Sequence, residues 1–278
     1  MGAQPATLGL TVERISRSEG RCLFGSDPAT YDSARPGHAE RAYEVLVEHC
    51  GLRAGSKVLE IGPGTGQATR RLLDLGADPL VAIEPDPALA DYVRATFGNR
   101  VEVRIAALEA AQLEADHFDL ATAASSFHWI EEDVGLARIA ATLRAGGWWA
   151  MWWTLFGEGR RKDAFMTAID PLLENLPSSP SSGWSSTRPA FALDVEARSA
   201  ALARAGFVDV CHELARWHAE WDSAGIRGLY STFSPIRKLD EMARERLLDE
   251  IETIAERDFG GRVGRTLTTS LYIAQKPT

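Results

Sequence analysis

Residues 57–67 read K-V-L-E-I-G-P-G-T-G-Q, and this stretch decides the fold. The apolar, partly β-branched run Val58 to Ile61 predicts a buried strand that ends abruptly at the glycines. The loop after it has a glycine at every other position: Gly62, Gly64 and Gly66. Glycine permits positive φ and close approach of the backbone to a ligand, and residues 68–75 predict a helix whose N-terminus faces that ligand. The stretch therefore predicts a strand, loop and helix that hold a nucleotide-like molecule.

The spacing of the glycines indicates which nucleotide. The dinucleotide fingerprint G-x-G-x-x-G needs a glycine three residues after Gly64, where this chain has Gln67. The pattern is E-x-G-x-G-x-G, and the carboxylate of Glu60 suits a cofactor with a positive amino group and would repel a pyrophosphate. The pattern resembles motif I of the class I S-adenosylmethionine-dependent methyltransferases, which implies that Glu60 holds the methionine ammonium, directly or through water. The alternative is a plain βα turn.

A second segment, Y-D-S-A-R-P at residues 31–36, resembles an element that precedes motif I in many small-molecule methyltransferases. The resemblance implies that Tyr31 touches the methionine part of the cofactor or the reacting methyl group, which gives it a candidate catalytic role. It also implies that Arg35 pairs with the methionine carboxylate. The alternative for this segment is a helix-capping turn with a solvated Arg35.

Glu84 is the predicted ribose ligand. It ends the apolar run 79–83, a second expected strand, and lies twenty positions after Gly64 (84 − 64), close to the position of the ribose-binding acid in Rossmann-type units. Asp86 is expected instead to cap a helix over 87–97, because Asp before Pro is typical of a helix start.

A third strand is expected at 101–105, and the adenine pocket should follow it. The resembled family usually carries an acidic residue there that receives the adenine amino group, but this chain has Ala107. Because of that departure, we expect the backbone around Ala107 and Leu108 to hold the adenine.

The fourth expected strand, 118–123, precedes S-S-F-H-W. Ligands gather at the carboxyl ends of parallel strands, so Ser125 should border the cofactor and the aromatic residues Phe127 and Trp129 should border the acceptor. The F-H-W triplet resembles the methyltransferase group that includes trans-aconitate methyltransferase. His128 is a candidate to orient an acceptor or to remove its proton, and it could equally only hydrogen-bond a loop.

The remaining chain completes the expected architecture. A tryptophan-rich fifth strand over 148–156 should bring Trp153 or Phe156 to the substrate cavity, and residues 266–274 predict a closing antiparallel strand. The resemblance implies a three-layer α/β/α Rossmann-like sandwich with a seven-stranded, mostly parallel sheet of order 3-2-1-4-5-7-6 and a helical cap. We divide the chain into an N-terminal segment (1–22), a cofactor-binding core (23–156), and the last strands with the inserted cap (157–278) in the same domain. The Ser/Pro/Gly-rich segment 175–189 is interpreted as a lid or as a plain linker.

Composition limits the partners. The formal net charge of −9 without a basic run disfavours nucleic acid and anionic membranes. Three distant cysteines suggest neither zinc nor disulfides, and we expect no metal. No apolar run is long enough to span a bilayer and the N-terminus lacks the apolar core of a signal peptide, so we expect a cytoplasmic protein. Its expected state is a monomer or homodimer.

The predicted function is methyl transfer from S-adenosylmethionine to a small-molecule acceptor by oxygen, nitrogen or carbon methylation. One alternative is a non-catalytic S-adenosylmethionine-binding regulatory protein. Another is an NAD(P)-dependent oxidoreductase, against which Gln67 and Glu60 both argue.

Overall fold

The computed structural model describes residues 15–21, 23–157, 162–180 and 189–278. Most of the N-terminal segment 1–22 and most of the predicted lid 175–189 therefore lie outside the described residues. Among those described, no helix has both the length and the apolar character needed to cross a bilayer.

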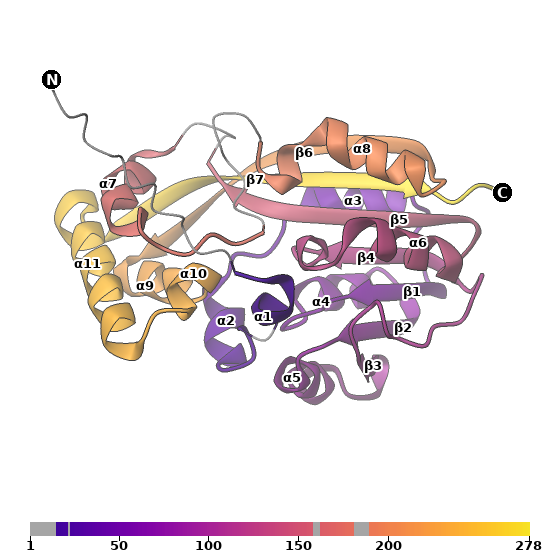
Figure 1. Cartoon of the computed structure of the whole chain (residues 1–278), viewed down its shortest axis with the longest axis horizontal. Coiled ribbons are helices and arrows are strands. Elements are labelled where there is room, and N and C mark those ends of the chain that lie inside the picture. Colours follow the sequence, from indigo (N-terminus) through magenta and orange to yellow (C-terminus); the bar gives the residue numbers. More distant parts are fainter. Residues whose placement is uncertain (1–14, 22, 158–161, 181–188) are drawn as a thin grey trace, which may run out of the picture.

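The centre of the molecule is a seven-stranded sheet of order β3-β2-β1-β4-β5-β7-β6 (Figure 1). Its strands are β1 (Ser56–Ile61), β2 (Ala77–Glu84), β3 (Glu102–Ile105), β4 (Phe118–Ala124), β5 (Leu143–Phe156), β6 (Val208–Asp222) and β7 (Arg262–Gln275). Strands β1 to β5 are parallel, and β7 runs antiparallel to both of its neighbours. The predicted strand order and the antiparallel closing strand are confirmed.

Helices cover both faces of this sheet. Helices α6 (Glu132–Thr142) and α8 (Val195–Arg204) pack on one face with Leu59, Phe118 and Trp149 of the strands. The other face is covered by α3 (Glu40–Glu48), α4 (Gln67–Asp74) and α5 (Pro87–Phe97), which bury Val58, Leu120 and Trp152. Alternate residues of a strand point to opposite faces, so a buried sheet needs apolar side chains at nearly every position. The result is the predicted three-layer sandwich.

A third apolar cluster forms the cap. It joins α7 (Ala164–Leu173), α9 (Ser223–Ser231), α10 (Ser234–Arg237) and α11 (Glu241–Phe259) at the end of the sheet where β5, β6 and β7 run on beyond the other strands (Figure 1). Strand β6 pairs with β7 as far as Asp222.

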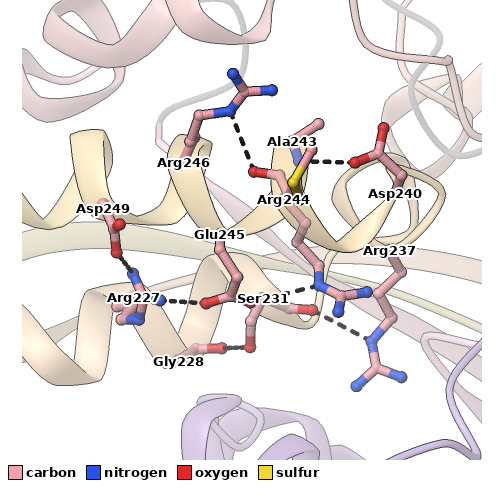
Figure 2. Close-up of polar contacts among 11 residues, drawn as sticks. Arg227, Gly228, Ser231, Arg237, Asp240, Ala243, Arg244, Glu245, Arg246 and Asp249 are labelled. Atoms are coloured by element: carbon pink, nitrogen blue, oxygen red, sulfur yellow. Dashed lines mark hydrogen bonds and ion pairs between the residues drawn. The ribbon is translucent and has the colours of Figure 1, made fainter.

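Polar contacts fix the cap helices to one another and to the N-terminal part of the chain. Arg227 of α9 bonds to Glu245 and Asp249 of α11, and Arg237 donates from Nε to the Ser231 carbonyl (Figure 2). Arg237 also donates to the Leu23 carbonyl at 2.7 Å. Leu23 lies between α1 (Arg17–Arg21) and α2 (Pro28–Ala34), and Figure 1 draws these two helices between the cap and the sheet.

Candidate functional site

A cavity of about 490 Å³ lies at the carboxyl ends of the parallel strands. Its wall is built by the loops that follow β1, β2, β3 and β4, by the end of β5, by the segment around α2 and by the start of α10. A volume in this range is typical of a small-molecule site. The apolar strands are buried in the sheet, so the polar residues at their carboxyl ends lie around this one cavity.

The glycine loop forms the floor of this cavity. Gly62, Gly64 and Gly66 all have positive φ, between +60° and +87°. A Cβ added at Gly62 would meet Ser126 and one at Gly66 would meet Phe97, whereas one at Gly64 would meet no atom within 4 Å. Glycine is needed at 62 and 66 for internal packing, while the backbone at Gly64 is bare toward the cavity.

Helix α4 begins directly behind this loop, at Gln67. Its N-cap is Gly66, which offers no side-chain oxygen to the first N–H groups of the helix. Unsatisfied N–H groups and the positive end of the helix dipole favour ligand oxygens and negative charge. The side chain of Gln67 turns away to the carbonyls of Asp32 and Arg35, both at 3.1 Å, which anchors the segment after α2 over the loop.

Glu84 stands at the end of β2 with its carboxylate in the cavity wall. Oε2 accepts from the Gly64 N–H at 3.2 Å and Oε1 accepts from the Asp86 N–H at 3.0 Å. Burial raises the pKa of Glu84 to about 7. A carboxylate offers about four lone-pair positions, so two remain for a ligand. Asp86 caps α5 by accepting from Ala88 and Leu89, as predicted.

Glu60 lies beneath the cavity and not in its wall. Its side chain is 1% exposed, and Oε2 accepts from the Thr69 hydroxyl at 2.6 Å. Oε1 is buried without a partner among the described residues. Burial raises the pKa of Glu60 to about 7, and the nearby charge of Glu84 adds to the shift. A buried carboxylate oxygen normally has a hydrogen-bond donor, and Oε1 has none among the described residues. That Glu60 holds the methionine ammonium stays a prediction.

Tyr31 and Arg35 border the cavity from the side of α2. The Arg35 guanidinium lies 5.2 Å from the centre of the Tyr31 ring and 4.6 Å from that of Phe233, and its Nε donates to the Thr232 hydroxyl at 2.7 Å. Burial lowers the pKa of Arg35. No carboxylate in the described part of the chain pairs with this cation, so its fixed position fits an anionic group of a ligand.

The triplet after β4 forms a 3₁₀ turn, Phe127–Trp129, that separates its three side chains. His128 and Trp129 line the cavity, whereas Phe127 is fully buried in the core against Trp149, with ring centres 5.2 Å apart. Ser125, with a φ of 55°, borders the cavity as well. Phe127 was predicted to contact the substrate, but the structure places its side chain in the core.

His128 is held from behind by β5. The Trp153 indole Nε1 donates to His128 Nδ1 at 3.0 Å. Both side chains line the cavity, and Phe156 lines it further along the same strand. Burial lowers the pKa of His128 to about 3, so the imidazole is neutral.

The structure brings together most of the residues that the sequence singles out. The cavity wall contains Tyr31, Arg35, Gly62, Gly64, Glu84, Ala107, Leu108, Ser125, His128, Trp129, Trp153 and Phe156. Glu60, Gly66 and Phe127 lie outside this wall: Glu60 points toward α4, Gly66 packs on Phe97, and Phe127 fills the core.

Several cavity residues escaped the sequence reasoning. His38 places Nδ1 3.2 Å from the Thr154 hydroxyl, and burial lowers its pKa to about 4. Phe233 and Ser234 come from the cap. Arg21 pairs with Glu109 and donates to the Trp129 carbonyl at 2.7 Å, which fixes the turn that carries His128. His38 follows the quoted Y-D-S-A-R-P stretch, and Phe233 and Ser234 belong to G-L-Y-S-T-F-S at 228–234, which faintly resembles a cap segment of the same methyltransferase group. No group of three or more His, Cys, Asp or Glu in the described ranges has the geometry of a metal site.

Comparison with known proteins gives the class. Residues 58–147, which contain the glycine loop and Glu84, match a family described as a methyltransferase domain. An uncharacterized methyltransferase of Schizosaccharomyces pombe is 24% identical over 91% of this chain and 96% of its own length. An uncharacterized methyltransferase of Mycobacterium bovis is 30% identical over 50% of this chain, and the match spans only about half (54%) of that relative.

The fold agrees with this class. Phosphoethanolamine N-methyltransferase 2 of Haemonchus contortus, solved with phosphomonomethylethanolamine and S-adenosylhomocysteine, superposes with a TM-score of 0.58 at 14% identity over 95% of this chain and 61% of that one. The domain match, the named relatives and the sheet order support a class I S-adenosylmethionine-dependent methyltransferase, and S-adenosylmethionine is the cofactor of that class. The narrower relationship to trans-aconitate methyltransferase stays a prediction.

Proposed function

We propose that the protein transfers the methyl group of S-adenosylmethionine to a small-molecule acceptor bound in the same cavity. The observation that carries the proposal is the continuity of that cavity. It runs from the bare backbone of Gly64 and the carboxylate of Glu84 to the imidazole of His128 and the aromatic residues Trp153 and Phe156.

The first group of residues suits the cofactor. The two free lone-pair positions of Glu84 would accept hydrogen bonds from two ribose hydroxyls, and the open space over Gly64 admits the ligand to the backbone. Arg35 would pair with the methionine carboxylate, because it is a positioned cation without a carboxylate partner of its own. Glu60 would act on the ammonium from below, through the neighbouring loop or a bridging water. Ala107 and Leu108 would border the adenine.

The second group suits an acceptor and excludes water. Phe24, Tyr31 and Trp129 line the cavity, and the Phe24 ring packs edge to face against the other two, with ring centres 5.6 and 6.1 Å apart. When bound, S-adenosylmethionine supplies a methyl group on a positively charged sulfur. In the transfer, the acceptor's lone pair would form the bond to the methyl carbon and the sulfur would keep the electrons of the broken bond. The work of the chain is to align the acceptor and to keep the space dry.

The acceptor atom is undetermined among oxygen, nitrogen and carbon, and a cytoplasmic monomer or homodimer is still a prediction. The oxidoreductase alternative conflicts with the methyltransferase domain. A non-catalytic binding protein would share the cofactor residues, so the experiment has to detect transfer itself.

The test is incubation with S-adenosylmethionine labelled on its methyl group and a panel of metabolites, followed by identification of the labelled compound. We expect one low-molecular-weight compound to gain the label. The Asp91→Ala variant, which alters an exposed carboxylate on α5, should label it equally well, and Glu84→Ala should label it more slowly. Label found only in protein or nucleic acid, or in nothing while the cofactor binds, would overturn the proposal.

A further inference from the structure

The hydrogen bond between Trp153 and His128 fixes which nitrogen of the imidazole carries the proton. Trp153 Nε1 donates to His128 Nδ1 at 3.0 Å. An indole N–H is a donor and never an acceptor, so Nδ1 has to present its lone pair. In a neutral imidazole with an accepting Nδ1, the proton is on Nε2.

The surroundings of His128 keep the ring neutral. The charged groups that act on it are Arg35 after α2 and Arg17 of α1, both positive, and Arg21 of α1 bonds the carbonyl of the neighbouring Trp129. Arg21 is engaged by Glu109, and no described carboxylate bonds the imidazole. Burial, with the charges of Arg35 and Arg17, lowers the pKa of His128. A second proton would also have to bind Nδ1, where it would face the indole N–H of Trp153.

Nε2 is the polar atom of His128 that is left for a ligand. No hydrogen bond joins it to any residue in the described part of the chain, and it is not among the buried atoms that lack a partner. It is therefore open to the cavity that His128 lines.

Building on the proposed function, we propose that His128 is a fixed hydrogen-bond donor to the methyl acceptor through Nε2–H, and that Trp153 is the positioning residue that sets its tautomer. The acceptor then presents a lone pair, such as that of a carbonyl, carboxylate or other oxygen, to this N–H.

The same hydrogen bond determines whether His128 can take a proton from the acceptor. To act as a base, His128 would need its lone pair at Nε2 and its proton at Nδ1, where two N–H groups would oppose each other. His128 therefore takes no proton during transfer. The attacking atom of the acceptor either arrives without a proton or releases it to another group.

Nitrogen NMR of imidazole-labelled protein tests the tautomer without any need for activity. We expect the His128 signals, assigned by their loss in His128→Gln, to show a protonated Nε2 and an unprotonated Nδ1 from pH 5.5 to 8.5 with no titration. A protonated Nδ1, or a titration near pH 6.5, would overturn the inference.

Two matched variants test the part played by Trp153. Trp153→Phe keeps an aromatic ring but removes the donor, so His128 should populate both tautomers and its pKa should move toward 6.5. Trp149→Phe is the control, because Trp149 lies on the same strand, is also buried, and has no partner for its indole N–H within the described residues. It should leave the His128 signals unchanged. An unchanged spectrum in Trp153→Phe would contradict the inference.

The rate of label transfer from methyl-labelled S-adenosylmethionine into a small-molecule extract tests donation to the acceptor. A glutamine side chain can donate a hydrogen bond but cannot act as a base, so His128→Gln should keep the rate within about tenfold, whereas His128→Phe should lose about a hundredfold or more. Equal loss in both variants would show that His128 acts as a base. If no label is transferred by wild type while the NMR result is as expected, the proposed function fails and the tautomer assignment stands.

Discussion

Replacing Glu84 by alanine should weaken S-adenosylmethionine binding by about one to two orders of magnitude. The carboxylate already holds the N–H groups of Gly64 and Asp86 and has room for two more hydrogen bonds at the cavity surface. Hydrogen bonds to a charged group contribute about 1.5–3 kcal/mol, and about 1.4 kcal/mol is tenfold in affinity. A net loss equal to one such hydrogen bond therefore corresponds to a dissociation constant raised about ten- to 150-fold.

The assay is calorimetric titration at pH 8, where Glu84 is ionised because its pKa is about 7. Thermal unfolding followed by circular dichroism checks that the variant folds. Glu84→Gln keeps an acceptor oxygen for one backbone N–H and should show a smaller loss than Glu84→Ala. The matched control is Asp91→Ala, which removes an exposed carboxylate paired only with Arg94 in the described structure. An unchanged dissociation constant in Glu84→Ala, or an equal loss in the control, would refute the assignment of Glu84.

Three further predictions follow from the same geometry. Cofactor affinity, measured by titration, should rise about tenfold from pH 6 to pH 8. Glu84, whose pKa is raised to about 7, changes from mostly protonated to mostly ionised over that range. Glu84→Gln should flatten the profile of affinity against pH. Gly64→Ala and Gly55→Ala both place a Cβ at positive φ in open space and should each cost about 1–2 kcal/mol in denaturant unfolding, but only Gly64→Ala should also weaken binding. Asp163→Ala should lower the free energy of unfolding by about 3–5 kcal/mol, because it leaves the guanidinium of Arg265, which is fully buried, without its carboxylate.

Each of these has an outcome that contradicts it. A cofactor affinity that falls from pH 6 to pH 8 would contradict the predicted pH dependence. Equal affinity in Gly64→Ala and wild type would show that the ligand does not approach that backbone. For Asp163, the control is Asp170→Ala, which breaks an exposed pair with Lys162 and should cost less than about 1 kcal/mol; a similar cost in both variants would show that the buried pair does not stabilise the cap.

The buried carboxyl groups of Glu60 and Glu84 also determine how the stability of the ligand-free protein changes with pH. Burial raises the pKa of Glu60 and Glu84 above the value of an unfolded chain, near 4.5. Their contribution to stability is therefore fully present below about pH 4.5 and is lost as pH rises through about 7. A bound cation at Glu60 and donors at Glu84 would offset that loss, so the ligand should stabilise the protein more at pH 8 than at pH 5.

The sheet and the cofactor end of the site were predictable because their signals are local. Three alternating glycines after an apolar run specify the turn, and the acid twenty residues after Gly64 lies at the end of the neighbouring strand by the regular length of a βα unit. The acceptor end was less predictable. Phe127 and His128 are adjacent in sequence, and only the 3₁₀ turn decides that one enters the core and the other the cavity.

Long-range contacts explain what the sequence could not give. Arg35 is positioned by Thr232, nearly two hundred residues away, and the tautomer of His128 is set by Trp153 on another strand. Strand periodicity alone does not reveal such pairs. Glu60 was recognised by its motif, but its bond to Thr69 and its place beneath the cavity depend on the packing of α4 against β1.

The most direct test of the whole account is a crystal structure of the protein with S-adenosylhomocysteine. The account predicts both ribose hydroxyl oxygens within hydrogen-bond distance, about 3.2 Å or less, of the Glu84 carboxylate, and the ligand's sulfur on the side of the cavity lined by His128 and Tyr31. A ligand bound with its ribose away from Glu84, or outside this cavity, would contradict it.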